Sequence, residues 1–222
     1  MTAHARSAPR SQYNVAALTA VTLIILTIAA YAIKDTLYLA ISGLADSSEL
    51  VKRAGILITE PALVALVVFT GLLVVWSWLR DRSAFFRLAC GGVGVVLGYA
   101  ASEGIKLVVQ QERPCAALEI VSAVACPETG DWSWPSNHSV IAAGFATACI
   151  LAAPRLVWFL APVAVLLGLS RVIVGVHYLH DVLAGLTLGF VAVLVCVAAL
   201  YPVAMRVVPA SLLPREEQQS GN

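Results

Sequence analysis

Short polar stretches rich in histidine, arginine and lysine interrupt an otherwise apolar chain at three places. These stretches are KLVVQQERP (106–114), PSNH (135–138) and SRVIVGVHYLHD (170–181). Each adjoins a long apolar run. Ionisable groups in such positions are costly to desolvate and usually face a polar cavity, so they indicate a binding or catalytic site, or an ion path.

The first stretch places two cations seven residues apart. On a continuous helix of 3.6 residues per turn, Lys106 and Arg113 lie nearly two turns apart and on the same face. Pro114 then ends the helix, because proline lacks the N–H that a helix interior needs. Two cations on one face beside a helix end predict a clamp for an anion.

The second stretch stands where an apolar run begins, and Ser136 occupies a favourable N-cap position. A helix N-terminus presents unpaired N–H groups and the positive end of a dipole, which together bind phosphate. Ser136 alone is better explained as a simple helix cap. His138, in the first turn of the expected helix, has no evident packing role and therefore favours a phosphate site.

The third stretch contains an arginine, two histidines and an aspartate. Arg171 and His177 cannot share a face of a continuous helix, since six residues correspond to about 240°, but Gly175 between them permits a turn. His177 and Asp181 are four residues apart, so the carboxylate can accept the Nδ1–H and leave Nε2 free as a nucleophile. His180 lies off this face and is expected at the membrane interface, bonded to water or headgroups.

Together these groups describe a phosphate site. Phosphoryl transfer needs charge stabilisation and in-line positioning above all, and three cations are available for it: Lys106, Arg113 and Arg171. Metal ligation by His138, His177 and Asp181 is conceivable. Crowding by the three cations argues against a metal, so we expect neither a metal nor another cofactor.

In order and internal spacing, the three stretches resemble the signature of the type 2 phosphatidic acid phosphatase superfamily. That signature is a lysine, six residues and Arg-Pro, then Pro-Ser-Gly-His, then Ser-Arg, five residues, His, three residues and Asp. The resemblance implies that His177 is a nucleophile that forms a phosphohistidine and that Asp181 orients it. It implies that His138 protonates the leaving group and later activates water. The implied phosphate ligands are Lys106, Arg113, Ser136, Asn137 and Arg171.

Asn137 departs from the signature, which has glycine at this position. Asparagine is the residue other than glycine that best tolerates a left-handed backbone. We therefore expect the phosphate cradle to persist, with an effect on catalytic rate or substrate fit.

The elements that carry these stretches are expected to be membrane-spanning helices. Of the 222 residues 60% are hydrophobic and 12% are charged, and the mean hydropathy is +0.88, far above that of a soluble domain. A spanning helix needs about 20 apolar residues. Six such runs are present, at about 14–33, 61–79, 88–109, 137–153, 156–174 and 182–205.

We therefore predict an all-α bundle of six transmembrane helices over residues 13–206, with the active site at the extracytoplasmic helix ends. Mobile cytoplasmic tails are expected at 1–12 and 207–222, which have too few apolar residues to pack. The segment 36–60 is about equally well explained as an interfacial helix or as a connecting loop.

The orientation follows from the excess of arginine on the side that holds both termini, which predicts that this side is cytoplasmic. The multi-pass protein then lies in the plasma membrane with the loop 110–136 facing outward. Cys115 and Cys126 both fall in this loop, where an oxidising compartment allows a disulfide. We expect these two cysteines to be bridged.

The expected activity is metal-independent hydrolysis of a phosphate or diphosphate from a lipid of the surrounding bilayer. By resemblance to many small bacterial members, a polyprenyl carrier (undecaprenyl or decaprenyl) is favoured. Phosphatidate or phosphatidylglycerophosphate is the main alternative, and the Ala-, Val- and Arg-rich composition adds decaprenylphosphoryl phosphoribose as a further possible substrate.

Three alternatives to lipid phosphate hydrolysis are phosphotransfer, ion transport and nucleic-acid binding. A lipid phosphotransferase would use the same site, and the sequence does not separate transfer from hydrolysis. An ion or proton path through Glu103 and Lys106 is disfavoured, because the polar residues gather at one face of the membrane and not through its depth. Nucleic acid is excluded as a partner, since no basic face is present.

Overall fold

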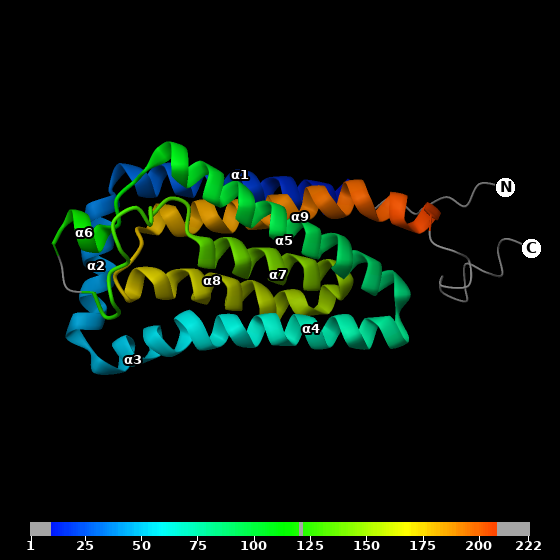
Figure 1. Cartoon of the computed structure of the whole chain (residues 1–222), viewed down its shortest axis with the longest axis horizontal. Coiled ribbons are helices and arrows are strands. Elements are labelled where there is room, and N and C mark those ends of the chain that lie inside the picture. The colour runs from blue at the N-terminus through cyan, green and yellow to red at the C-terminus, as the bar shows by residue number, and fades with distance from the viewer. Residues whose placement is uncertain (1–9, 120–121, 208–222) are drawn as a thin grey trace, which may run out of the picture.

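The computed structural model describes residues 10–119 and 122–207, and every regular element in these ranges is a helix (Figure 1). The all-α class predicted from the sequence is therefore confirmed. The helices are α1 (Arg10–Ala32), α2 (Lys34–Ser47), α3 (Glu49–Leu57), a π-helical segment (Ile58–Ala62), α4 (Leu63–Arg80), α5 (Arg82–Val109), α6 (Pro114–Ala117), α7 (Asn137–Ala152), a 3₁₀ turn (Pro154–Leu156), α8 (Val157–Ile173) and α9 (Leu179–Val207). Most of the tails predicted at 1–12 and 207–222 lies outside the described residues.

Several of these helices are long and apolar enough to cross a membrane. Five helical runs meet this description: Asn14–Ala32, Glu49–Arg80, Arg82–Ala117, Pro154–Ile173 and Leu179–Val207. They coincide with five of the six predicted spans. The other predicted span corresponds to α7, which is apolar but has only 16 residues, or about 24 Å at 1.5 Å per residue. The protein is thus a multi-pass membrane protein with five to six apolar helices.

The long helices lie side by side, and the short elements gather at one end of the bundle (Figure 1). In the middle, α7 packs against α5, α8 and α9, and its side chains are mostly buried. The outer helices expose large apolar side chains such as Trp158 and Leu72, as expected for a surface that faces lipid. The segment 36–60, for which helix and loop were both considered, forms α2 and α3, and α2 crosses the end of the bundle.

Two glycines of α9 let this helix approach the first turns of α7 closely. A Cβ atom at Gly185 would lie 2.5 Å from the carbonyl oxygen of Ser136, and one at Gly189 would collide with the carbonyl oxygen of Val140. Small residues permit such backbone approach between membrane helices. The Ser136 N–H also donates to the Asp181 carbonyl oxygen over 3.0 Å. The start of α7 is therefore held directly against the start of α9.

The loop between α5 and α7 covers the same end of the bundle. Cys115 and Cys126 form a disulfide within it, with their Cα atoms 6.1 Å apart. The Ala123 N–H donates to the carbonyl oxygen of Val174 over 3.0 Å, so the loop is joined to the turn between α8 and α9. The Tyr38 hydroxyl of α2 donates to the carbonyl oxygen of Gly175 in that turn, also over 3.0 Å.

The close contact of α9 with α7 predicts that Gly189→Ala lowers the stability of the folded protein. The added methyl group has no room against the Val140 carbonyl, and overpacking of this kind costs ~1–3 kcal/mol. Thermal unfolding of the detergent-solubilised protein measures the effect. Gly71→Ala on α4 is the control, because a Cβ there meets nothing within 4 Å. Equal unfolding temperatures for the two variants would contradict the packing described here.

Candidate active site

The three polar stretches come together at the end of the bundle that α2 and the α5–α7 loop cover. Arg113 of the first stretch donates from Nη1 to the carbonyl oxygen of Val176 (3.1 Å) and contacts Nε2 of His177 (2.9 Å) in the third. The backbone bond from Ser136 to Asp181 joins the second stretch to the third. Residues more than sixty positions apart in the chain thus form one cluster.

The hydrogen bonds of His177 define which of its ring nitrogens is free to react. The guanidinium of Arg113 can only donate, so Nε2 of His177 accepts and Nδ1 carries the proton. Nδ1 lies 3.2 Å from Oγ of Ser133 and 3.3 Å from Oδ2 of Asp181. The predicted contact between His177 and Asp181 is present, although α9 begins only at Leu179. A lone pair on Nε2 therefore faces the cationic group of Arg113.

Asp181 is fully buried and is held by donors from three parts of the chain. Its carboxylate accepts from Nε2 of Gln111 (2.9 Å), from the backbone N–H of Tyr178 (2.9 Å) and from the hydroxyl of Ser133. Sequence reasoning missed Gln111 and Ser133. Gln111 lies inside the first polar stretch, so its position could have identified it. No motif or spacing in the sequence identifies Ser133.

Lys106 and Arg113 converge as predicted, but not on one helix face. Helix α5 ends at Val109, because Gln110 takes a left-handed conformation (φ 49°) and donates its N–H to the Lys106 carbonyl. Arg113 then lies in extended backbone before Pro114, the conformation that a following proline favours. The prediction of a continuous helix through Arg113 was wrong.

A carboxylate that sequence reasoning did not single out brings these two cations together. Oδ1 of Asp131 lies 2.9 Å from Nη2 of Arg113 and 3.9 Å from Nζ of Lys106, and the Asp131 carbonyl accepts from Nε of Arg113 over 2.8 Å. Partial burial acts to raise the pKa of Asp131, but the hydrogen bond and charge of Arg113, and then Lys106, bring the pKa below its ordinary value. Asp131 is therefore ionised and compensates both cations.

Arg171 and His138 meet at the π-helical segment before α4. Nη1 of Arg171 donates to Oγ1 of Thr59 (2.7 Å) and lies 3.5 Å from Oε1 of Glu60. The same Glu60 oxygen lies 2.8 Å from Nε2 of His138. Nε of Arg171 is buried and has no hydrogen-bond partner within the described ranges, which makes it a candidate donor to a bound anion. Thr59 and Glu60 were not among the predicted site residues.

Ser136 and Asn137 begin α7 as predicted, but each differs from the expectation in detail. Ser136 occupies the N-cap, yet its hydroxyl makes no capping bond and is buried without a partner in the described structure. Asn137 is helical and not left-handed. Its side chain accepts a hydrogen bond from the Ser102 hydroxyl and donates one to Glu103, each with a donor–acceptor distance of 2.7 Å. Asparagine therefore fits this position without backbone strain.

His180 does not lie at the interface, which corrects the prediction. Its ring is buried between Tyr31 and Tyr178, with ring centroids 5.0 and 5.4 Å away. Nε2 contacts Oε1 of Gln111 (3.0 Å) and Oδ1 of Asp181 (3.1 Å). The close packing of α1 and the turn before α9 leaves this ring no path to water, and it supports the Asp181 network instead.

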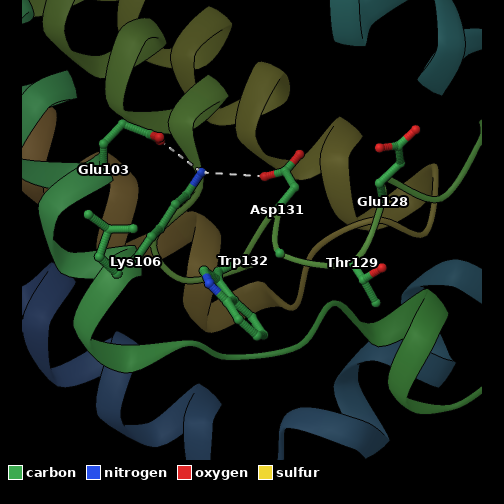
Figure 2. A pocket seen from close by; sticks show the side chains of 8 residues that line it. Glu103, Lys106, Glu128, Thr129, Asp131 and Trp132 are labelled. Atoms are coloured by element: carbon green, nitrogen blue, oxygen red, sulfur yellow. Dashed lines mark ion pairs between the residues drawn. The ribbon is translucent and has the colours of Figure 1, made fainter.

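A cavity of about 360 Å³ opens beside Lys106. It is lined by Glu103, Lys106, Leu107, Glu128, Thr129, Gly130, Asp131 and Trp132. Figure 2 shows the Lys106 ammonium between the carboxylates of Glu103 and Asp131. Three carboxylates in its wall make this cavity unsuited to a phosphate group.

The charges of the site keep His177 neutral. Complete burial, followed by the charges of Arg113, Arg171 and Lys106, holds the pKa of His177 well below its ordinary value of 6.5. A buried cation is disfavoured beside other cations, whereas a neutral imidazole is the form that can attack phosphorus. The arrangement thus places a neutral imidazole inside a cationic pocket.

This geometry predicts where the acid limb of the pH–rate profile lies. Activity needs the deprotonated ring, so kcat/KM falls only when the pH drops through the depressed pKa of His177, below 6.5. The profile should be recorded with two substrates whose phosphates ionise at different pH values. The limb common to both belongs to the enzyme. A common limb at or above pH 6.5 would contradict the neutral, buried nucleophile.

The chain is similar to several known membrane phosphatases. The undecaprenyl-diphosphatase BcrC of Bacillus subtilis is 30% identical over 155 residues, which cover 70% of this chain and 78% of that protein. An undecaprenyl-diphosphatase of Sulfolobus acidocaldarius is 36% identical over 121 residues, covering 54% of this chain and 56% of that protein. The crystal structure of a PAP2 type phosphatidylglycerolphosphate phosphatase from Bacillus subtilis is 21% identical, with a TM-score of 0.54, and covers 88% of this chain and 98% of that one.

A family model narrows the comparison to the helices that carry the site. The model of the PAP2 superfamily matches residues 87–203, and these residues include all three polar stretches. The match therefore spans the cations, the histidines and the buried aspartate described above. On this evidence the chain belongs to the PAP2 superfamily.

Proposed function

We propose that this protein is a membrane lipid phosphatase that hydrolyses a polyprenyl diphosphate through a phosphohistidine intermediate. The observation that carries the proposal is the hydrogen bonding of His177, whose Nε2 lone pair faces the buried guanidinium of Arg113 while Nδ1 lies beside Asp181 and Ser133. Such a site matches the need of phosphoryl transfer for a positioned nucleophile and concentrated positive charge.

In the first step, Nε2 of His177 attacks the terminal phosphorus. The phosphate takes over the hydrogen bond that Arg113 makes to Nε2, which frees the lone pair. The N–P bond forms as the P–O bond to the leaving group breaks, and Asp181 stabilises the positive charge that develops on the ring. His138 is assigned to protonate the leaving oxygen.

In the second step, water attacks the phosphorus of the phosphohistidine. His138 accepts a proton from this water, the O–P bond forms, and the N–P bond to His177 breaks. Inorganic phosphate then leaves. The phosphate oxygens are assigned to Lys106, Arg113, Arg171 and the Ser136 hydroxyl, and the last of these is supported by the absence of any other partner for this buried group. No metal is needed, because the cations supply the charge that a metal ion supplies elsewhere.

The substrate class is inferred from two relatives named as undecaprenyl-diphosphatases, one of which this chain matches over most of its length. The site lies at the end of apolar helices. It therefore suits a lipid whose phosphates stay at the headgroup level while its chain remains in the bilayer. Phosphatidate and phosphatidylglycerophosphate are the competing substrates.

The topology belongs to the same proposal. We assign α7 as the sixth span, so that both termini lie on the arginine-rich, cytoplasmic side. The active site then opens at the outer face of the plasma membrane. The disulfide between Cys115 and Cys126 supports this side, because disulfides persist in oxidising compartments.

Phosphate release by the purified protein in detergent and chelator tests the proposal. A polyprenyl diphosphate and phosphatidate are compared as substrates. We expect the diphosphate to be hydrolysed faster, at a rate that chelation leaves unchanged. His177→Ala should lower kcat by at least about 10⁴-fold, since it removes the nucleophile.

Cys196→Ala on α9 is a suitable control, because Cys196 is a free thiol remote from the cluster and its loss should leave the rate unchanged. Faster hydrolysis of phosphatidate would reassign the substrate. Activity that disappears with the chelator, or survives in His177→Ala, would refute the mechanism.

A further inference from the structure

A glutamate outside the three polar stretches contacts two side chains of the site, His138 and Arg171. Glu60 belongs to the π-helical segment Ile58–Ala62, within the apolar run Glu49–Arg80 that is long enough to cross the membrane. π-Helical turns inside helices are rare in proteins overall, but those that occur often lie at functional sites. An ionisable residue within such a run indicates a functional role and a partner of opposite charge or a hydrogen-bond donor.

The shortest contact of Glu60 is with the histidine of the second stretch. Its Oε1 atom lies 2.8 Å from Nε2 of His138 and 3.5 Å from Nη1 of Arg171. Nη1 of Arg171 has a closer partner in Thr59, at 2.7 Å. An ionised carboxylate only accepts, so Nε2 of His138 carries a proton. Nδ1 is therefore the nitrogen of His138 left to face a substrate.

This pair mirrors the pair formed by His177 and Asp181. Asp181 contacts Nδ1 of His177 and leaves Nε2 with a lone pair, as a nucleophile requires. Glu60 contacts Nε2 of His138 and leaves Nδ1 free. Each histidine thus has its own carboxylate, on opposite ring nitrogens.

The cations of the site explain why His138 needs a carboxylate such as Glu60 beside it. A proton donor must hold its proton until the leaving group takes it, and neighbouring cations oppose that charge. Arg171 donates a hydrogen bond to Thr59 of the same π-helical segment. The Glu60 carboxylate contacts both Arg171 and His138, so these two side chains lie near each other. Glu60 is the carboxylate in direct contact with the His138 ring among the described residues.

We propose that Glu60 is a positioning residue that orients His138 and stabilises its protonated form during leaving-group departure. The inference rests on the proposed function. As the P–O bond breaks, Nδ1 of His138 gives its proton to the leaving oxygen, while Nε2–H stays bonded to Glu60. In the second step Nδ1 takes a proton from the attacking water, and Glu60 stabilises the imidazolium that results.

A different role for the same contact makes the opposite kinetic prediction. If the Glu60 carboxylate only occupied the place of a phosphate oxygen, its removal would lower KM and leave kcat unchanged. Loss of a positioning residue for a proton donor lowers kcat/KM, and most strongly for substrates with poor leaving groups, because their departure depends on protonation.

The test compares Glu60→Gln with the unmodified protein on dodecyl phosphate, whose alcohol leaves poorly, and on p-nitrophenyl phosphate, whose phenolate leaves without a proton. We expect kcat/KM for dodecyl phosphate, which reports the steps through leaving-group departure, to fall on the order of 10- to 100-fold, a part of the 10²–10⁴ that a positioned acid contributes. The loss of kcat/KM with p-nitrophenyl phosphate should stay below about threefold. Glu60→Asp, which keeps the carboxylate, should recover part of the loss on dodecyl phosphate.

Glu49→Gln is the matched control, because Glu49 begins the same helical run and pairs only with the exposed Arg53. Equal losses of kcat/KM on both substrates, no loss on either, or a lower KM at constant kcat would each overturn the role of Glu60. If the unmodified protein hydrolyses neither these substrates nor a polyprenyl diphosphate, the proposed function fails instead. ¹⁵N NMR of labelled histidine then decides the contact alone: a protonated Nε2 on His138 that is lost in Glu60→Leu supports it, and unchanged spectra overturn it.

Discussion

Three basic side chains, Lys106, Arg113 and Arg171, are buried at one end of the helix bundle, and the rest of the site follows from the need to compensate them. Desolvation of an ion costs several kcal/mol unless a partner or a hydrogen bond offsets it. Glu103 and Asp131 flank Lys106, Asp131 also pairs with Arg113, and Glu60 lies beside Arg171. Among the described residues, Nε of Arg171 has no hydrogen-bond partner. We propose that a phosphate oxygen of the substrate takes this place.

The same cations determine the chemistry of the histidine that they surround. Their charges, added to complete burial, keep the pKa of His177 low and its ring neutral, while Arg113 donates to Nε2 and thereby selects the reactive tautomer. Asp181 holds the other nitrogen from the first turn of α9. The glycines of α9 that face α7 make this arrangement possible, because they bring the first turn of α7 against the helix that carries Asp181.

The sequence predicted the convergence of the polar stretches better than it predicted their geometry. The contact between His177 and Asp181 was predicted correctly from their spacing, because a separation of four residues brings two side chains together in a turn as well as in a helix. Lys106 and Arg113 do converge, but Gln110 ends the helix between them. Asp131 and Glu60 were missed because they reach the site through a loop and through a span 78 positions before His138, and tertiary packing of this kind leaves no periodic pattern in the sequence.

The covalent intermediate on His177 is the claim on which the mechanism depends, and rapid quenching tests it directly. The purified protein is mixed with a diphosphate substrate whose terminal phosphate carries an isotopic label, quenched within milliseconds under alkaline conditions that preserve phosphohistidine, and digested for mass spectrometry. The mechanism predicts labelled phosphate on His177 during turnover and none in the His177→Ala protein. Label on His138, or turnover with no labelled histidine, would contradict it.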